Sequence, residues 1–209
     1  MEDILDQYEK PASDREPVIC LDEQPIQLLE DSRPSEAARP GHPAKQDYEY
    51  QRRGTCSAFV AVEPKRGQRL VQVQKHRKKA DFARFVRDVL QQHPHAKTIH
   101  LVLDNLNTHK PASLMETFGA EKAEKLLQRI EWHYTPKHAS WLNMAEIELS
   151  ALTRQCMARR IPSLEETRKQ IRAWSKDRNR KKICIQWKFK KADAKNVFPS
   201  LYKRKKLAG

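Results

Sequence analysis

The chain has 209 residues, enough for one domain of ordinary size, or one domain with a tail, and too few for a second independent core. Its formal charge of +14 is uneven: residues 1–50 hold 5 Lys and Arg against 13 Asp and Glu, and the remaining residues hold 36 against 14. The excess of basic residues over positions 51–209 indicates a polyanionic partner, most often nucleic acid. A charge that serves only solubility, or a ribosome-type binding surface, would give the same excess.

The cysteines and the hydropathy pattern limit the compartment. Cys20, Cys56, Cys156 and Cys184 are far apart in sequence and form no Cys-x-x-Cys pair, which argues against a zinc knuckle and a secreted disulfide framework. The longest apolar run is the five residues Ala58–Val62, and the N-terminus is acidic, unlike a signal peptide. We therefore expect a cytoplasmic protein with reduced thiols and no membrane span.

Two apolar runs followed by acids come first in chain order. Val18–Asp22 is expected to be a buried strand that ends in an acid, and Ile99–Leu103 is a second buried run, directly followed by Asp104. Between them, Glu30–Gly54 carries prolines and a glycine among many charges. This stretch is expected to be a long loop or irregular hairpin, for which a functional role and disorder remain equal alternatives.

The other elements follow from periodicity. Thr55–Glu63 and Gln68–Gln74 predict a hairpin that forms an antiparallel group with the strand at Val18. Further predictions are helices over Phe82–Leu90 (capped by Asp81), residues 111–129 and Ser140–Arg159, a helix opened by the capping box Ser163–Glu166, and a strand over Ile130–Tyr134. In the basic C-terminal part, Ile183–Phe189 alternates like a strand or an extended segment that tracks DNA.

Asp22 and Asp104 are candidate ligands because each ends a buried strand. Open α/β folds bind ligands at the carboxyl ends of their strands. For either acid alone, a structural role as a helix N-cap or a loop residue is the better interpretation. For the two together, the order of the strands in the sheet decides whether they form a site, since neighbouring parallel strands would bring both carboxylates to one edge.

Helix geometry separates Glu146 from Glu148, because two residues are about 200° of rotation apart. Glu146 shares a stripe with Leu142 and Leu149, so we expect it to face the core, where an acid is costly unless it is paired or metal-bound. Glu148 is expected to lie in solvent. A salt bridge from Glu146 to one of the many basic residues remains an equal alternative.

Three converging carboxylates suit Mg²⁺ or Mn²⁺, which prefer oxygen ligands. Two such ions about 4 Å apart can activate a water and stabilise the leaving oxygen of a phosphodiester. Asn105, Asn107 and His109, just past Asp104, could orient a phosphate or water, or serve the structure of the loop. The other histidines singled out are expected at the surface or facing DNA rather than in a zinc site: His93, His95, His133 and His138.

Longer motifs carry a family resemblance. Leu103–His109 (LDNLNTH), Tyr134–Glu146 (YTPKHASWLNMAE) and Arg160–Pro162 (RIP) together resemble the catalytic domain of bacterial insertion-sequence transposases of the mariner superfamily. Val18–Pro25 (VICLDEQP) is similar to that family's first catalytic block, so the resemblance covers roughly residues 1–200. The Pro-x-x-x-Ser-x-Leu-Asn-x-x-Glu spacing is specific, whereas isolated Asp blocks are not.

The resemblance implies an α/β, RNase H-like fold, with a mixed five-stranded sheet flanked by helices. It also implies a catalytic and metal-binding triad of Asp22, Asp104 and Glu146 with Mg²⁺ or Mn²⁺. Similar enzymes cleave DNA at element ends and use the freed 3′-hydroxyl to attack target DNA. His138 and Asn143, within the quoted motif, join Asn105 and His109 as candidates for positioning the substrate.

The expected organisation is an acidic lead-in at residues 1–17, a catalytic domain at 18–178 and a basic C-terminal tail at 179–209. The implied partners are double-stranded DNA, both element ends and target, and a second copy in a homodimeric DNA complex, which suggests a nucleoid-associated protein. Because such transposases usually carry an N-terminal helix-turn-helix region, we expect either a separate helix-turn-helix polypeptide or a truncated relic. The alternative functions are a non-catalytic basic DNA-binding remnant and a structure-selective nuclease of the same fold.

Overall fold

A five-stranded mixed sheet forms the centre of the computed structural model, which describes residues 1–34, 36–45 and 47–199. The strands are β1 (Val18–Asp31), β2 (Tyr50–Glu63), β3 (Gln68–Gln74), β4 (Ile99–Leu103) and β5 (Ile130–Tyr134). Their order is β3-β2-β1-β4-β5; β1 to β3 pair antiparallel, and β1, β4 and β5 pair parallel. The predicted sheet class and the antiparallel group are confirmed.

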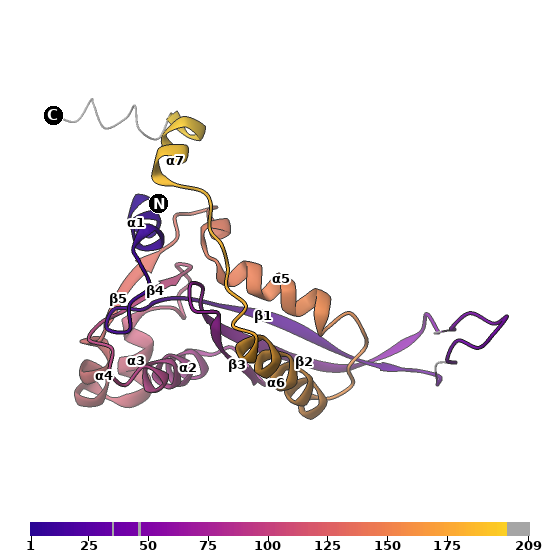
Figure 1. Ribbon diagram of the computed structural model, residues 1–209. Coiled ribbons are helices and arrows are strands. Elements are labelled where there is room, and N and C mark those ends of the chain that lie inside the picture. The colour runs from indigo at the N-terminus through magenta and orange to yellow at the C-terminus, as the bar shows by residue number, and fades with distance from the viewer. Residues whose placement is uncertain (35, 46, 200–209) are drawn as a thin grey trace.

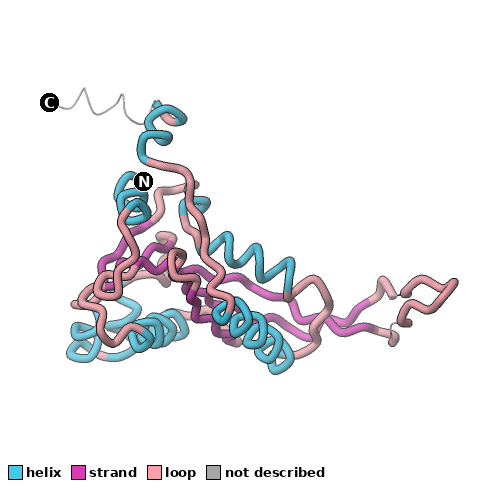
Figure 2. The backbone as a smooth tube through the Cα atoms, in the orientation of Figure 1, coloured by secondary structure: helices cyan, strands magenta, loops and turns pink. Residues whose placement is uncertain are grey.

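Helices cover both faces of this sheet (Figures 1 and 2). They are α1 (Glu2–Glu9), α2 (Lys79–Gln92), α3 (Pro111–Phe118), α4 (Ala120–Leu127), α5 (Ala145–Gln155), α6 (Leu164–Arg180) and α7 (Lys191–Val197). Alternation along the strands divides the core between the faces. In β2, Phe59 and Ala61 pack with α2, α3 and α4, whereas Ala58, Val60 and Val62 face α1, α5 and α6.

The first strand is longer than the sequence prediction. β1 continues nine residues past Asp22, to Asp31, so Asp22 lies within a strand and not at its end. The continuation alternates buried Ile26 and Leu28 with polar residues, the period of a half-buried strand. β1 and β2 project from the body as a long pair, with a register shift between Gln27 and Leu29, and the predicted loop shrinks to residues 32–49 (Figure 1).

Local signals explain where the predicted helices differ. The helix predicted over residues 111–129 is two helices, interrupted at Gly119, whose φ of 78° lies outside the helical region. The helix predicted over Ser140–Arg159 is a 3₁₀ turn over Ser140–Leu142 followed by α5. Asp81 lies inside α2 and accepts a hydrogen bond from the backbone N–H of Lys78, whereas Ser163 caps α6 as predicted.

Both ends of the described chain pack on the same face of the sheet. Residues of the expected lead-in form α1, where Ile4 and Leu5 are fully buried, and the Tyr8 hydroxyl donates to the Leu142 carbonyl oxygen at 2.6 Å. The expected tail begins inside α6, then runs extended, with the backbone N–H of Ile185 donating to Pro64 O at 2.9 Å, and ends in α7 beside α1 (Figure 1). Residues 200–209 of that expected tail lie outside the described residues.

In the described part of the chain, no helix combines the length and the apolar character that crossing a membrane requires.

Candidate active site

Two acids meet because their strands are parallel neighbours. β1 and β4 are in register at Cys20 and Val102, so Asp22 and Asp104 each follow a paired residue by two positions. An even offset keeps both side chains on the same side of the sheet. Asp22 is 8% exposed, and the side chain of Asp104 is 28% exposed. The sheet order therefore brings the first two predicted ligands together.

Asn143 fixes the start of α5 against the first of these strands. Its Nδ2 donates to the Leu21 carbonyl oxygen at 2.9 Å and lies 3.4 Å from Asp22 Oδ2. Its Oδ1 accepts from the backbone N–H of Ala145 at 3.2 Å, within the turn that opens the helix. Asn143 is fully buried and holds the first turn of α5, which carries Glu146, beside Asp22.

The charges of this group act on Asp22. Burial, together with the neighbouring charges of Glu146, Asp104 and Glu23, raises the pKa of Asp22 to about 7, against a hydrogen bond from the Glu23 backbone N–H that lowers it. All three side-chain charges that act on Asp22 are negative. Asp22, Asp104 and Glu146 thus form one electrostatically coupled set, in which a bound cation would relieve the repulsion.

Behind the acids, a buried histidine joins two carboxylates. His109 is fully buried; its Nδ1 hydrogen-bonds Asp104 Oδ1, and its Nε2 lies 2.7 Å from Glu23 Oε2. Burial disfavours the charged ring, but the hydrogen bonds and charges of Asp104 and Glu23 outweigh it and raise the pKa of His109 to about 9. A protonated His109 therefore orients the Asp104 carboxylate from the buried side and is not itself accessible to solvent.

Sequence reasoning missed Glu23, whose side chain is only 4% exposed. Alternation places it on the opposite face of β1 from Asp22, toward the apolar layer beneath the sheet. There the His109 ring stacks on Phe82 with 4.6 Å between centroids. A buried acid on the apolar side of a strand needs a hydrogen-bonding or charged partner. The position of Glu23 in the strand pattern could therefore have identified it as part of the site.

The predicted exposures of the two α5 glutamates are wrong. Glu146 is exposed, whereas Glu148 is fully buried and pairs with Arg69 at 2.7 Å and with Arg178 at 2.8 Å. The cause is the helix start: Leu142 lies in the preceding 3₁₀ turn, so its spacing to Glu146 has no helical meaning. Within α5, Glu148 shares the inward face with Ala145, Leu149 and Leu152.

The remaining candidates lie in different environments. Asn105, Asn107 and His138 are exposed, and Asn105 Oδ1 accepts a hydrogen bond from Lys110. His138 adopts a left-handed backbone conformation with φ of 62°. His133, expected at the surface or facing DNA, is 2% exposed inside the protein. Of the four proposed substrate-positioning residues, only Asn105 and His138 are accessible.

The donor set fits a hard divalent ion. It consists of carboxylate oxygens on a surface-open edge, which suit Mg²⁺ or Mn²⁺, ions that retain waters among their ligands. Within the described residues, the three acids do not approach one another as a close cluster with ligand atoms within 4.8 Å. The charges of Glu146 and Asp104 nevertheless both act on Asp22, so the three acids share one neighbourhood at a wider spacing.

Comparison with known proteins places this chain in a known family. The sequence model described as DDE superfamily endonuclease matches residues 17–168. No curated protein matches the sequence. Among solved structures, the "Mos1 transposase paired-end complex with left transposon end" has a TM-score of 0.58 at 17% identity, covering 87% of this chain and 55% of that one.

Two further solved structures agree. The "Mos1 mariner paired end complex with Mn" gives a TM-score of 0.58 at 17% identity, covering 87% of this chain and 55% of that chain. The catalytic domain of Mos1 mariner transposase gives a TM-score of 0.54 at 14% identity, and the match covers 87% of this chain and 87% of that chain. The chain thus spans about half the length of the transposases in the paired-end complexes and nearly all of the isolated catalytic domain.

The fold is therefore the RNase H-like fold of a mariner transposase catalytic domain, as the sequence motifs implied. With a family match over most of its length, the chain belongs to the DDE superfamily endonucleases.

Proposed function

We propose that this chain is the catalytic domain of a DNA transposase that cleaves DNA strands and transfers them with two Mg²⁺ or Mn²⁺ ions. Asp22, Asp104 and Glu146 would be the metal ligands. The observation that carries the proposal is the electrostatic coupling of these acids, which come from β1, the end of β4 and the first turn of α5. The family match supports the reaction class, and one structural relative is described as a complex with Mn.

The ions would supply activation of the attacking oxygen and stabilisation of the leaving oxygen of the phosphodiester. The protein holds the ligands in place. Asp22 is fixed by the Glu23 backbone N–H and by Asn143, and Asp104 is oriented by His109. Because Asp22 lies on β1 and Asp104 directly follows the neighbouring strand β4, the sheet would hold their spacing during the reaction.

The proposed partner is double-stranded DNA, both element ends and target. The formal charge of +14 and the solved relatives, which are described as paired-end complexes, support it. We also propose that two copies act together in the DNA complex. Recognition of the element ends by a separate helix-turn-helix polypeptide remains a prediction, as does the choice of target site.

Supercoiled plasmid supplies a test that needs no knowledge of the element ends. With Mn²⁺, the wild-type protein should convert it to nicked circle, and chelation should stop the reaction. Asp22→Asn and Asp104→Asn should each lose this activity while retaining the plasmid in a gel-shift assay at low salt. Equal nicking by Asp104→Asn and wild type would refute the proposed site. DNA retention without any metal-dependent nicking would favour the non-catalytic remnant.

A further inference from the structure

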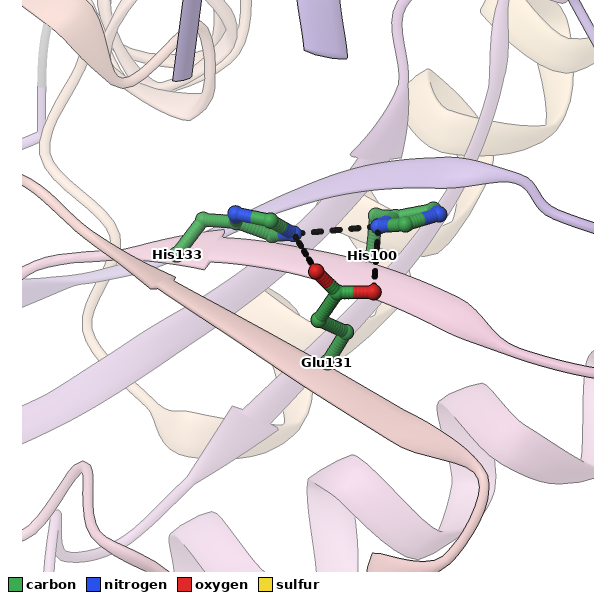
Figure 3. Close-up of side chains that lie close together, drawn as sticks. All are labelled: His100, Glu131 and His133. Atoms are coloured by element: carbon green, nitrogen blue, oxygen red, sulfur yellow. Dashed lines mark hydrogen bonds and ion pairs between the residues drawn. The ribbon is translucent and has the colours of Figure 1, made fainter. Parts of the chain in front are cut away.

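A second group of ligand-type side chains lies on β4 and β5. His100, Glu131 and His133 point toward one another from these two neighbouring strands, on the face that carries α1 (Figure 3). The two rings are buried, at 5% and 2% exposure, whereas the side chain of Glu131 is 56% exposed. Within the described residues, this is the one group of three such side chains whose ligand atoms all lie within 4.8 Å of one another.

The strand register brings the three together. His100 is paired with Glu131 in the parallel β4–β5 ladder, and His133 lies two residues beyond Glu131 on the same face. The site lies at the beginning of β4, whereas Asp104 follows the end of that strand. The two groups therefore use opposite ends of β4.

The separations lie within about half an ångström of those in a tetrahedral metal site. His100 Nδ1 and His133 Nε2 are 3.0 Å apart, and each faces a different oxygen of Glu131, at 3.4 Å and 3.8 Å. An ion bound at about 2.0–2.2 Å places its tetrahedral ligand atoms about 3.3–3.6 Å apart. To admit an ion, the two imidazole nitrogens would separate by a few tenths of an ångström, and the exposed Glu131 side chain would adjust to them.

The protonation of the rings also suits a metal. His133 Nδ1 lies 2.7 Å from Asp3 Oδ2 in α1, which holds the proton on Nδ1. The His133 Nε2 lone pair then accepts a hydrogen bond from His100 Nδ1 at 3.0 Å, and a bound ion would take the place of that shared proton. Neutral imidazole is the form that binds metals.

We propose that His100, Glu131 and His133 bind one divalent transition-metal ion, Zn²⁺ above all, with water in the fourth position. Two imidazoles and one carboxylate favour such ions over Mg²⁺, which prefers an all-oxygen set. Binding would cross-link β4 to the edge strand β5 and, through Asp3, hold α1 to both. The site thus has a structural role, separate from the acids of the proposed active site.

A titration in an active-site-deficient background tests the proposal. Metal-free Asp104→Asn protein is titrated with Zn²⁺ by calorimetry and with Co²⁺ by visible absorption. We expect one ion per chain and a tetrahedral Co²⁺ spectrum, neither displaced by excess Mg²⁺. Added Zn²⁺ should raise the melting temperature.

Variants separate binding from folding. Glu131→Gln changes an exposed side chain, so it should fold normally and bind Zn²⁺ at least about ten-fold more weakly, and Asp3→Asn should lose about ten- to a hundred-fold. His100→Gln should abolish the site. The matched control is His138→Gln, an exposed loop histidine that should leave binding unchanged.

Two outcomes would overturn the proposal: Zn²⁺ binding that is equal in Glu131→Gln and His138→Gln, or absence of stoichiometric binding in the folded parent protein. Neither outcome touches the nicking activity proposed above, which rests on other residues and is tested with Mn²⁺.

Discussion

The two sides of α5 carry acids in opposite situations. On the buried side, Glu148 is held by Arg69 and Arg178, so its charge is balanced within hydrogen-bonding distance. On the open side, the charge of Glu146 adds to those of Asp104 and Glu23 on Asp22. Glu146 and Glu148 are only two residues apart, but about 200° of helix rotation places one among like charges and the other between arginines.

This contrast separates an acid that stabilises the fold, Glu148, from the acids that we propose bind metal. A buried carboxylate with two guanidinium partners joins α5 to β3 and α6, because Arg69 and Arg178 come from those elements. Asn179 reinforces this network by accepting from Arg69 Nη1 at 3.0 Å. The neighbouring acids raise the pKa of Asp22, and a group of like charges gains most from an added cation.

The largest effect is expected for Glu146→Gln. Loss of a metal ligand should lower Mn²⁺-dependent plasmid nicking by at least about a thousand-fold, about 4 kcal/mol of transition-state stabilisation. The free energy of unfolding should stay within about 0.5 kcal/mol of wild type, because the side chain is exposed. Glu165→Gln, also an exposed acid in the first turn of a helix, is the matched control. Unchanged nicking in Glu146→Gln would remove the open side of α5 from the active site.

The reverse pattern is expected for Glu148→Gln. Breaking a buried ion pair leaves two guanidinium groups without their counter-charge, so the free energy of unfolding should fall by about 3–5 kcal/mol. Urea unfolding measures this loss. Nicking per folded molecule should be largely kept below the melting temperature. A Glu148→Gln protein as stable as Glu165→Gln would show that the arginine pair contributes little.

His109 provides a pH signature. Its pKa is about 9 in the folded protein, above the ordinary value of 6.5, so its contribution is fully present below pH 6.5 and is lost as the pH rises through about 9. The wild type should lose on the order of 3 kcal/mol of stability across this window. His109→Gln should be less stable at pH 6.5 and lack this loss, whereas His138→Gln should retain it. Identical pH profiles for wild type and His109→Gln would contradict the bridging role.

The smallest effect concerns proton competition at Asp22. Its pKa is raised to about 7, so below that pH a metal ion must displace a proton from this carboxyl. Mn²⁺ affinity measured by calorimetry should therefore fall by up to about ten-fold per pH unit as the pH drops below 7. Asp22→Asn should bind Mn²⁺ weakly at every pH. An affinity that is flat between pH 5 and 7 would indicate that Asp22 is already ionised.

Much of the fold could be predicted from periodicity. Gln68–Gln74, Ile99–Leu103 and Ile130–Tyr134 match their predicted strands, because each is a short run bounded by turn signals or charge. The extension of β1 beyond Asp22 was not predicted, because only two buried apolar residues alternate with polar ones in this part of the projecting hairpin. The phase of α5 was misjudged because the 3₁₀ turn before it breaks the helical count.

The motifs along the chain were sufficient to identify the family and to select Asp22, Asp104 and Glu146 as candidate ligands, and the charge pointed to nucleic acid. The environments of these side chains depend on the tertiary structure. Strand order brings Asp22 beside Asp104, and the true start of α5 buries Glu148 between arginines and leaves Glu146 open. Register brings His100 and His133, 33 residues apart, to 3.0 Å. Spacing along a chain fixes direction only within one regular element, and contacts between elements depend on how the sheet is assembled.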